Sequence, residues 1–171
     1  GNNTQRLLID LRHGVDGFLS RRSRNFRKAI RRSQRRAQQE GIEIEEAPTV
    51  DADALFERIM RVEARSWKGR DEAGIGEGPM HEFYKDMLPR LCGRDAARVL
   101  FATREGEDLA YIFGGVLSGG YRGLQFSYDW EQRSLGLGNL LQIEQIRRLC
   151  DEGVLSYDLG MDMEYKRRWA D

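Results

Sequence analysis

The sequence predicts a single α+β domain over residues 1–171. Three short apolar runs between residues 98 and 128 are joined by glycine-bearing turns, which is the pattern of an antiparallel meander. The third run leads through a glycine-rich turn into an amphipathic helix, and one more apolar run follows at residues 155–161. Helices with one apolar stripe fill much of the first half of the chain. Strands and helices segregated in this way are typical of the α+β class.

The N-terminal part begins with a short apolar strand at residues 7–11 and continues into a very basic helix at about residues 20–41. Ser20 or Ser23 is the expected N-cap, and Gly41 is the expected stop. One thin apolar stripe indicates that a single face of this helix docks, and it consists of Phe26, Ala29, Ile30, Ser33 and Ala37.

Period-two alternation at residues 42–45 predicts a half-buried strand. After Pro48, Asp51 or Asp53 is the expected cap of a second helix. A third helix follows a glycine-rich loop, and Pro89 is expected to end or kink it near its last turn.

The C-terminal half predicts strands at residues 98–103, 109–117 and 121–128, a helix at about 139–150 and a last strand at 155–161. Gly-bearing turns separate the first three strands, and Gly153 is the expected end of the helix. Residues 121–150 thus form a strand-turn-helix unit.

Composition and cysteine usage narrow the class of protein. The chain is 40% hydrophobic and 33% charged, as expected of a soluble globular domain, and it contains no apolar run that could span a bilayer. Cys92 and Cys150 lack metal-ligand spacing, so we expect small buried thiols in a reducing, cytoplasmic compartment. His13 and His81 have no neighbouring ligand set, so no metal site is expected.

The zero net charge hides a strong asymmetry. Residues 20–41 carry nine Lys and Arg residues against one acid, a local charge of +8 (9 − 1), so the rest of the chain carries −8. An anionic partner is one interpretation, with Arg31, Arg32 and Arg35 as contact residues. The other is a solvated helix that pairs in part with acidic surface on the same molecule.

The segment Arg133–Gly138 has the spacing R-x-x-G-x-G between a predicted strand and a predicted helix. Glycines let the backbone turn tightly and bring its N–H groups close to an oxyanion. A helix start adds free N–H groups and the positive end of its dipole, and Arg133 can add a forked contact. The turn therefore predicts a phosphate site, with an ordinary loop as the alternative interpretation.

Several strings in this order resemble the GNAT acyltransferase superfamily and, within it, the FemAB-like branch, some of whose members are linked to bacterial cell-wall and polysaccharide synthesis. The resemblance extends from about Ser20 to Trp169. The strings are Ser-Arg-Asn-Phe-Arg-Lys at the start of the basic helix, Ser66–Gly69, Tyr128-Asp129, Arg133–Gly138, Asp158–Gly160 and Tyr165–Trp169.

The resemblance implies a GNAT-like mixed, mostly antiparallel central sheet flanked by helices. It implies that Arg133, Gly136, Leu137, Gly138 and Asn139 bind the donor, because the family holds the coenzyme A pyrophosphate with a Q/R-x-x-G-x-G/A segment after its fourth strand. Leu135 and Leu137 depart from the Pro or Ser usual in this turn. Related proteins continue beyond Trp169 into a final strand pair. A sheet that lacks this pair is therefore one of the expected alternatives.

Removal of a proton from an amine calls for a carboxylate, a tyrosine or a water chain, since the histidines are poorly placed. Asp129, Asp158 and Tyr165 are the candidates, and each also has a structural interpretation as a cap, an Arg partner or a packing residue. Strand alternation predicts that Asp158 faces the cleft near Asp129, where each carboxylate raises the proton affinity of the other.

Lys166 is a predicted phosphate or carboxylate contact, with a solvated chain-end cation as the alternative. Trp67 is a predicted substrate or partner contact, with core or edge packing as the alternative. Trp130 and Trp169 flank the expected cleft in sequence, so either could form a wall for an acyl or sugar group.

The function expected from this resemblance is N-acyl transfer from an acyl-CoA or an acyl-phosphopantetheine carrier to a small-molecule or glycan amine, without a metal. An acyl-carrier protein is acidic and would suit the basic helix. One alternative is a FemABX-like transferase that uses charged tRNA, whose phosphates would meet the same helix. The other is a non-catalytic GNAT-fold module that binds an anionic partner.

Overall fold

Within residues 6–66, 78–161 and 164–171, which the computed structural model describes, a six-stranded sheet in the order β1-β6-β5-β4-β3-β2 forms the centre of the protein. The strands are β1 (Arg6–Asp10), β2 (Glu43–Glu46), β3 (Ala97–Arg104), β4 (Glu107–Leu117), β5 (Gly120–Tyr128) and β6 (Ser156–Met161). The helices are α1 (Gly14–Ser20), α2 (Arg24–Gln39), α3 (Ala52–Glu63), α5 (Gly78–Gly93), α6 (Leu137–Glu152) and α7 (Glu164–Arg167), and a 3₁₀ helix, η1 (Trp130–Leu135), precedes α6.

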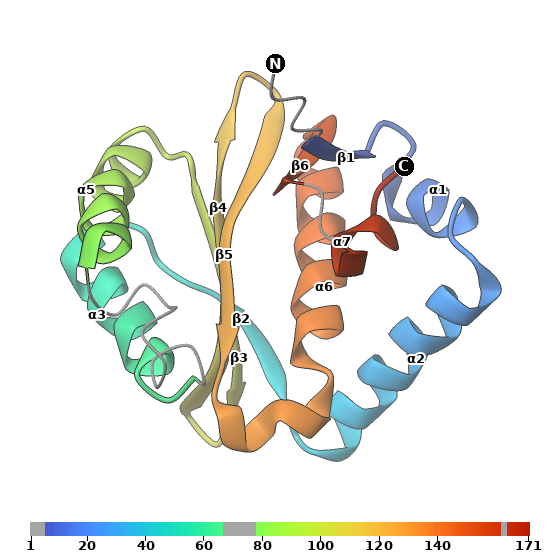
Figure 1. Cartoon of the computed structure of the whole chain (residues 1–171), viewed down its shortest axis with the longest axis horizontal. Coiled ribbons are helices and arrows are strands. Elements are labelled where there is room, and N and C mark those ends of the chain that lie inside the picture. The colour runs from blue at the N-terminus through green and yellow to red at the C-terminus, as the bar shows by residue number, and fades with distance from the viewer. Residues whose placement is uncertain (1–5, 67–77, 162–163) are drawn as a thin grey trace.

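Helices cover both faces of this sheet (Figure 1). Helices α3 and α5 lie on one face, and α6 lies on the other with α1 and α2 outside it. Strands β5 and β6 are parallel, whereas every other neighbouring pair is antiparallel. The predicted α+β class with a mostly antiparallel sheet is confirmed, and β3, β4 and β5 form the predicted meander.

Helix α2 follows the predicted pattern closely. Ser23 is its N-cap, and the Ser23 hydroxyl accepts a hydrogen bond from the Phe26 N–H at 3.1 Å. A stripe of residues at helical spacing packs towards α6, while the opposite side faces solvent. The buried members of the stripe are Phe26, Ile30, Ser33 and Ala37.

Three details differ from the sequence-based expectations. Helix α1 was not anticipated, and of the two N-caps expected for the basic helix the structure uses Ser23, since α2 begins at Arg24. Of the two expected effects of Pro89 near the last turn, an end or a kink, the end does not occur at this residue, since α5 continues to Gly93. One lost hydrogen bond is outweighed there because the neighbouring Leu88 is buried against the sheet. The 3₁₀ helix η1 was not anticipated.

A charged residue lies inside the core between α3 and the sheet. The side chain of Glu63 is fully buried, and its Oε1 accepts a hydrogen bond of 2.6 Å from the Tyr111 hydroxyl. Burial and the adjacent carboxylate raise the pKa of Tyr111 well above its usual value, so the phenol stays protonated and keeps donating. The Ser66 hydroxyl donates to the backbone carbonyl of Glu63 at 2.8 Å and lies 3.5 Å from Oε2 of the Glu63 carboxylate. A buried carboxylate is tolerable only with such partners.

We expect Tyr111→Phe to lower the free energy of unfolding by about 1–3 kcal/mol, because it leaves the buried Glu63 oxygen without its donor. Urea unfolding followed by circular dichroism measures this change. Tyr128→Phe is the control on a half-buried tyrosine of β5. Equal stability of Tyr111→Phe and wild type would contradict a stabilising role for the pair.

Candidate active site

The parallel strands β5 and β6 separate after three residue pairs. The last pair joins Arg122 to Asp158. Just beyond it, each strand carries one residue without a partner in the neighbouring ladder: Leu124 of β5 against β4, and Leu159 of β6 against β1. Such bulges bend a strand and increase its twist. The sheet therefore opens between β5 and β6 at the point where both strands bend.

A cavity of about 250 Å³, here called the split-strand cavity, lies at this opening. Strand β5, the first turns of α6, strand β6 and the segment around α7 form its walls. The lining residues are Ile112, Gly123–Phe126, Gly138, Asn139, Gln142, Tyr157, Leu159, Lys166, Arg168 and Trp169. From Gly123 onward, β5 has no strand partner on this side among the described residues, so its backbone edge faces the cavity.

The walls combine an apolar body with a few polar groups. The Tyr157 hydroxyl donates to Gln142 Oε1 at 2.7 Å, which orients the Gln142 amide and leaves its nitrogen available to a ligand. Glycines let the walls approach closely: a Cβ at Gly138 would lie 3.2 Å from the Phe126 ring, and one at Gly123 would lie 3.2 Å from the Tyr157 ring. A cleft that combines an apolar surface with convergent polar side chains is typical of a small-molecule site.

The predicted phosphate turn lies only partly at this cavity. Gly138 and Asn139 line it, whereas Arg133 and Gly136 do not. The Arg133 guanidinium donates to the Trp130 carbonyl at 3.0 Å and lies over the Trp130 ring, 4.9 Å from its centre.

Helix α2 covers the middle of the same turn. Gly136 has φ +67°, and a Cβ there would lie 2.8 Å from Ser33 Oγ of α2. Leu137 is buried in the core beneath it. Gly136 thus serves the tight turn and the approach of α2, a role that the R-x-x-G-x-G spacing alone could not distinguish from phosphate binding.

The two predicted carboxylate bases lie far from each other. Asp158 is opposite Arg122, and Asp129 is seven residues farther along the chain, roughly 23 Å at the usual rise of a strand. Their expected mutual effect on proton affinity is therefore wrong. Asp158 accepts from Arg6 Nε at 2.7 Å and from the Gly160 N–H at 2.8 Å. The buried Asp129 caps η1 by accepting from the Glu131 N–H at 3.0 Å.

The expected orientation of the last strand is also wrong. Tyr157 and Leu159 line the split-strand cavity, whereas Asp158 does not. The bulge at Leu159 and the ion pair with Arg6 hold Asp158 towards β1 instead. Sequence alternation could not reveal this, because α6 places the cleft on the apolar side of β6.

Of the remaining candidates, the structure places Lys166 at the cavity, as part of its lining. The backbone of Tyr165 is part of α7, but its side chain is outside the described part of the structure. Trp67 lies wholly outside the described residues. Trp169 is buried at 5% exposure and also lines the cavity. Gln142 and Tyr157 were missed, because neither residue type carries a motif.

Helix α2 presents a row of basic side chains to solvent. Among the described residues, six of its cations are exposed and form no ion pair, whereas Arg27 donates to the carbonyl oxygens of Leu19 and Arg22. The six, here called the α2 basic surface, are Arg24, Lys28, Arg31, Arg32, Arg35 and Arg36. The interpretation that acids of the same molecule pair with the basic segment holds in part, because Arg21 and Arg22 pair with Asp171, whereas the six cations of the α2 basic surface have no such partner among the described residues.

The two cysteines and the possible metal ligands of the described residues add no further reactive site. Burial raises the pKa of the Cys92 and Cys150 thiols, which disfavours the thiolate that a nucleophile needs. Within the described ranges, no group of three or more His, Cys, Asp or Glu residues could hold a metal ion. The same part of the chain contains no helix long and apolar enough to cross a membrane.

Comparison with known families identifies this architecture. The family described as Acetyltransferase (GNAT) domain matches residues 24–167. The chain belongs to this GNAT family. The resemblance found in the sequence is thereby confirmed, and a GNAT acetyltransferase domain is consistent with an enzyme. A search among curated proteins gave no significant match.

Solved structures share the fold at low sequence identity. FemX superposes with a TM-score of 0.71 at 12% identity over 96% of this chain and 57% of its own. L-PGS from Bacillus licheniformis gives 0.65 at 19% over 92% and 45%. A GNAT acetyltransferase from Brucella melitensis in complex with acetyl-CoA gives 0.57 at 18% over 76% and 82%. This chain thus spans about half the length of FemX and L-PGS, and these likenesses show a shared fold.

We expect Gly136→Ala to lower the free energy of unfolding by about 1–3 kcal/mol, because its backbone is left-handed and the new methyl group would meet Ser33. Thermal and urea unfolding measure the loss. Gly93→Ala is the matched control, since a Cβ at Gly93 meets nothing within 4 Å. If Gly136→Ala were as stable as the control, the packing role of this glycine would be refuted.

Proposed function

We propose that the protein is an N-acyltransferase that moves an acyl group from a thioester donor, acyl-CoA or an acyl-phosphopantetheine carrier, to an amine acceptor. The observation that carries the proposal is the backbone edge of β5 facing the split-strand cavity. GNAT membership supports the reaction class. The donor and the acceptor are our inference.

The chemistry of a pantetheine arm suits this cavity. The arm is an extended chain with two amide groups, which can pair with the free N–H and C=O groups of a strand edge. An N–H of β5 beyond Gly123 can also donate to the thioester carbonyl oxygen as negative charge develops on it. Gln142, Lys166 and Arg168 line the same space and can hold polar parts of either substrate.

The amine must lose a proton during transfer. Asp158 and Asp129 are engaged elsewhere, so we assign this proton to a water chain or to Tyr165, whose neighbour Lys166 lines the cavity. We further propose a cytoplasmic site of action, which suits free Cys92 and Cys150. A small-molecule or glycan amine of the bacterial cell envelope or of a polysaccharide is the proposed acceptor class.

Transfer is tested with the purified protein, acyl-CoA or acyl-carrier donors and a panel of amines, by following thiol release and the mass of the acylated amine. We expect Gly138→Val to lower kcat/KM for the donor at least tenfold, because the side chain enters the cavity beside Phe126. Gly93→Val is the folded control. If the wild-type protein consumes no thioester with any amine, the proposed donor class is wrong.

A second candidate is transfer of an aminoacyl group from charged tRNA. The unpaired cations of the α2 basic surface favour it, because tRNA phosphates would release counterions on binding them. An acidic carrier protein would use the same cations. Both partners would therefore bind the same cations, but one carries an acyl-phosphopantetheine donor and the other is an aminoacyl-tRNA donor.

We expect replacement of Arg31, Arg32, Arg35 and Arg36 by Ser to weaken binding of the true partner at least tenfold at low salt and to flatten its salt dependence. Fluorescence anisotropy with acyl-carrier protein and with tRNA decides between the two. The matched control removes four exposed cations from the opposite face of the sheet: Arg61, Lys85, Arg90 and Arg94. Equal losses in both variants would mean that total charge, and not the α2 basic surface, attracts the partner.

A further inference from the structure

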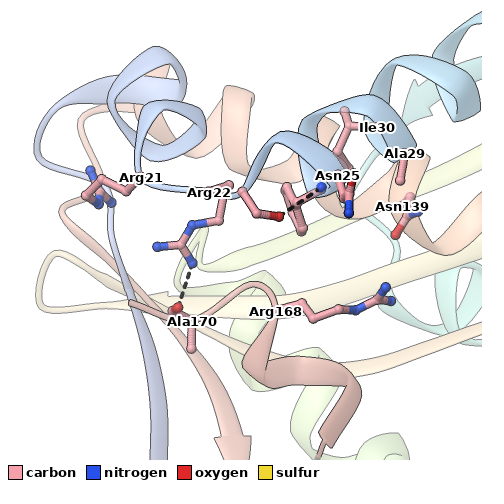
Figure 2. A pocket seen from close by; sticks show the side chains of 10 residues that line it. Arg21, Arg22, Asn25, Ala29, Ile30, Asn139, Arg168 and Ala170 are labelled. Carbon is pink, nitrogen blue, oxygen red and sulfur yellow. Dashed lines mark hydrogen bonds between the residues drawn. The ribbon is translucent and has the colours of Figure 1, made fainter.

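A second cavity, of about 370 Å³, lies between the start of α2, the first turn of α6 and the segment that follows α7. Figure 2 shows Arg22 and Arg168 on different sides of it, with Asn25 and Asn139 towards the helices. Here it is called the α2–α7 cavity. Residues of the strings Ser23–Lys28 and Tyr165–Trp169, together with Asn139, line it, but no spacing in the sequence shows that these three distant segments meet.

The charge around this cavity is positive. Arg21, Arg22 and Arg168 line it, whereas the carboxylate of Asp171 pairs with Arg21 and Arg22 and that of Asp10 also acts on Arg21. Asp171 is fully used, since it accepts from Arg21, from Arg22 and from the Asp10 N–H. Burial alone would raise the pKa of Asp171, but these donors lower it, so the carboxylate stays ionised and Arg168 is left to other anions.

Arg22 lies in the wall with unused donor capacity. Its side chain is 7% exposed, and it donates to the carbonyl oxygens of Trp169 and Ala170 at 2.6 Å each and to Asp171. Its Nε–H is buried without a partner. A buried donor of this kind is unfavourable unless a ligand or water accepts from it.

The start of α2 adds further donors. Ser23 accepts from the N–H groups of Phe26 and Arg27, through its hydroxyl and its carbonyl respectively. The first-turn N–H groups of Arg24 and Asn25 have no partner within the described residues. In a helix of 16 residues these groups form the positive end of the dipole and attract anions.

The two cavities adjoin each other. Asn139 and Arg168 line both of them. Phe26 and Ile30 give the α2–α7 cavity an apolar wall. A ligand with an anionic group here and a chain past Asn139 would therefore reach the split-strand cavity.

We propose that the α2–α7 cavity binds a phosphate ester group of a substrate whose reactive end lies in the split-strand cavity. A phosphate offers three acceptor oxygens, which match a guanidinium, side-chain amides and helix N–H groups better than a planar carboxylate does. Helix α2, which covers Gly136 of the predicted phosphate turn, supplies these donors at its own start. The position of the reactive end rests on the proposed function, whereas the phosphate site does not.

The phosphate has two possible sources, the donor arm or the acceptor. Matched ligand pairs separate them: 4′-phosphopantetheine against pantetheine for the donor, and glycerophosphoethanolamine against ethanolamine for the acceptor. Calorimetric affinities are measured for wild type, for Arg168→Gln and for the control Arg167→Gln, an exposed neighbour that lines neither cavity. Arg22 is unsuitable for substitution because it also holds Trp169 and Ala170.

We expect wild type to prefer the phosphorylated member of one pair at least tenfold, Arg168→Gln to lose that preference and Arg167→Gln to keep it. Inorganic phosphate should also shift the Arg22 Nε–H resonance in a ¹H–¹⁵N spectrum. No preference in either pair, or a preference that survives Arg168→Gln, would overturn the proposal. These readouts need no turnover, so a phosphate preference without transfer would reject only the proposed function, and transfer without a preference would reject only this site.

Discussion

The separation of β5 from β6 is the constraint on which the rest of this molecule depends. A parallel pair that continued to the end of β5 would satisfy that backbone edge and close the sheet. The bulges at Leu124 and Leu159 prevent this and leave hydrogen-bonding groups facing a cavity. Helix α6 must then begin beside the opening, and the glycines at 123 and 138 let the walls approach each other.

Helix α2 covers the glycine turn at the start of α6. It packs on α6 and meets the glycine turn at Ser33, so the turn is filled from outside by protein. A phosphate site over Gly136 would compete with this packing. The N-terminus of α2, Arg22 just before it and the α2 basic surface lie beside the turn. The positive charge is therefore found along α2 and not over Gly136.

Much of the fold followed from the sequence because local signals and global packing agree. The Ser23 cap, the stripe at Phe26 and Ile30 and the meander are all fixed by short-range chemistry. The site was less accessible. Gly138, Asn139 and Lys166 were among the predicted residues and line the cavity, whereas Gln142 and Tyr157 carry no motif. Asp158 was oriented wrongly because a bulge and an ion pair with Arg6 override simple alternation.

Trp169 attaches one wall of the split-strand cavity to helices α1 and α2. Trp169, which lines the split-strand cavity, stacks on Phe18 of α1 at 5.9 Å between ring centres and meets the Phe26 ring of α2 edge-on at 4.8 Å. One cavity wall is thus fastened to the helix that carries the cations. A partner that displaced α2 would also displace that wall, so its docking and the binding of a ligand in the cavity would be thermodynamically linked. Linkage is reciprocal, so a partner that docked on α2 and changed ligand affinity by some factor would have its own affinity changed by the same factor when the ligand is bound.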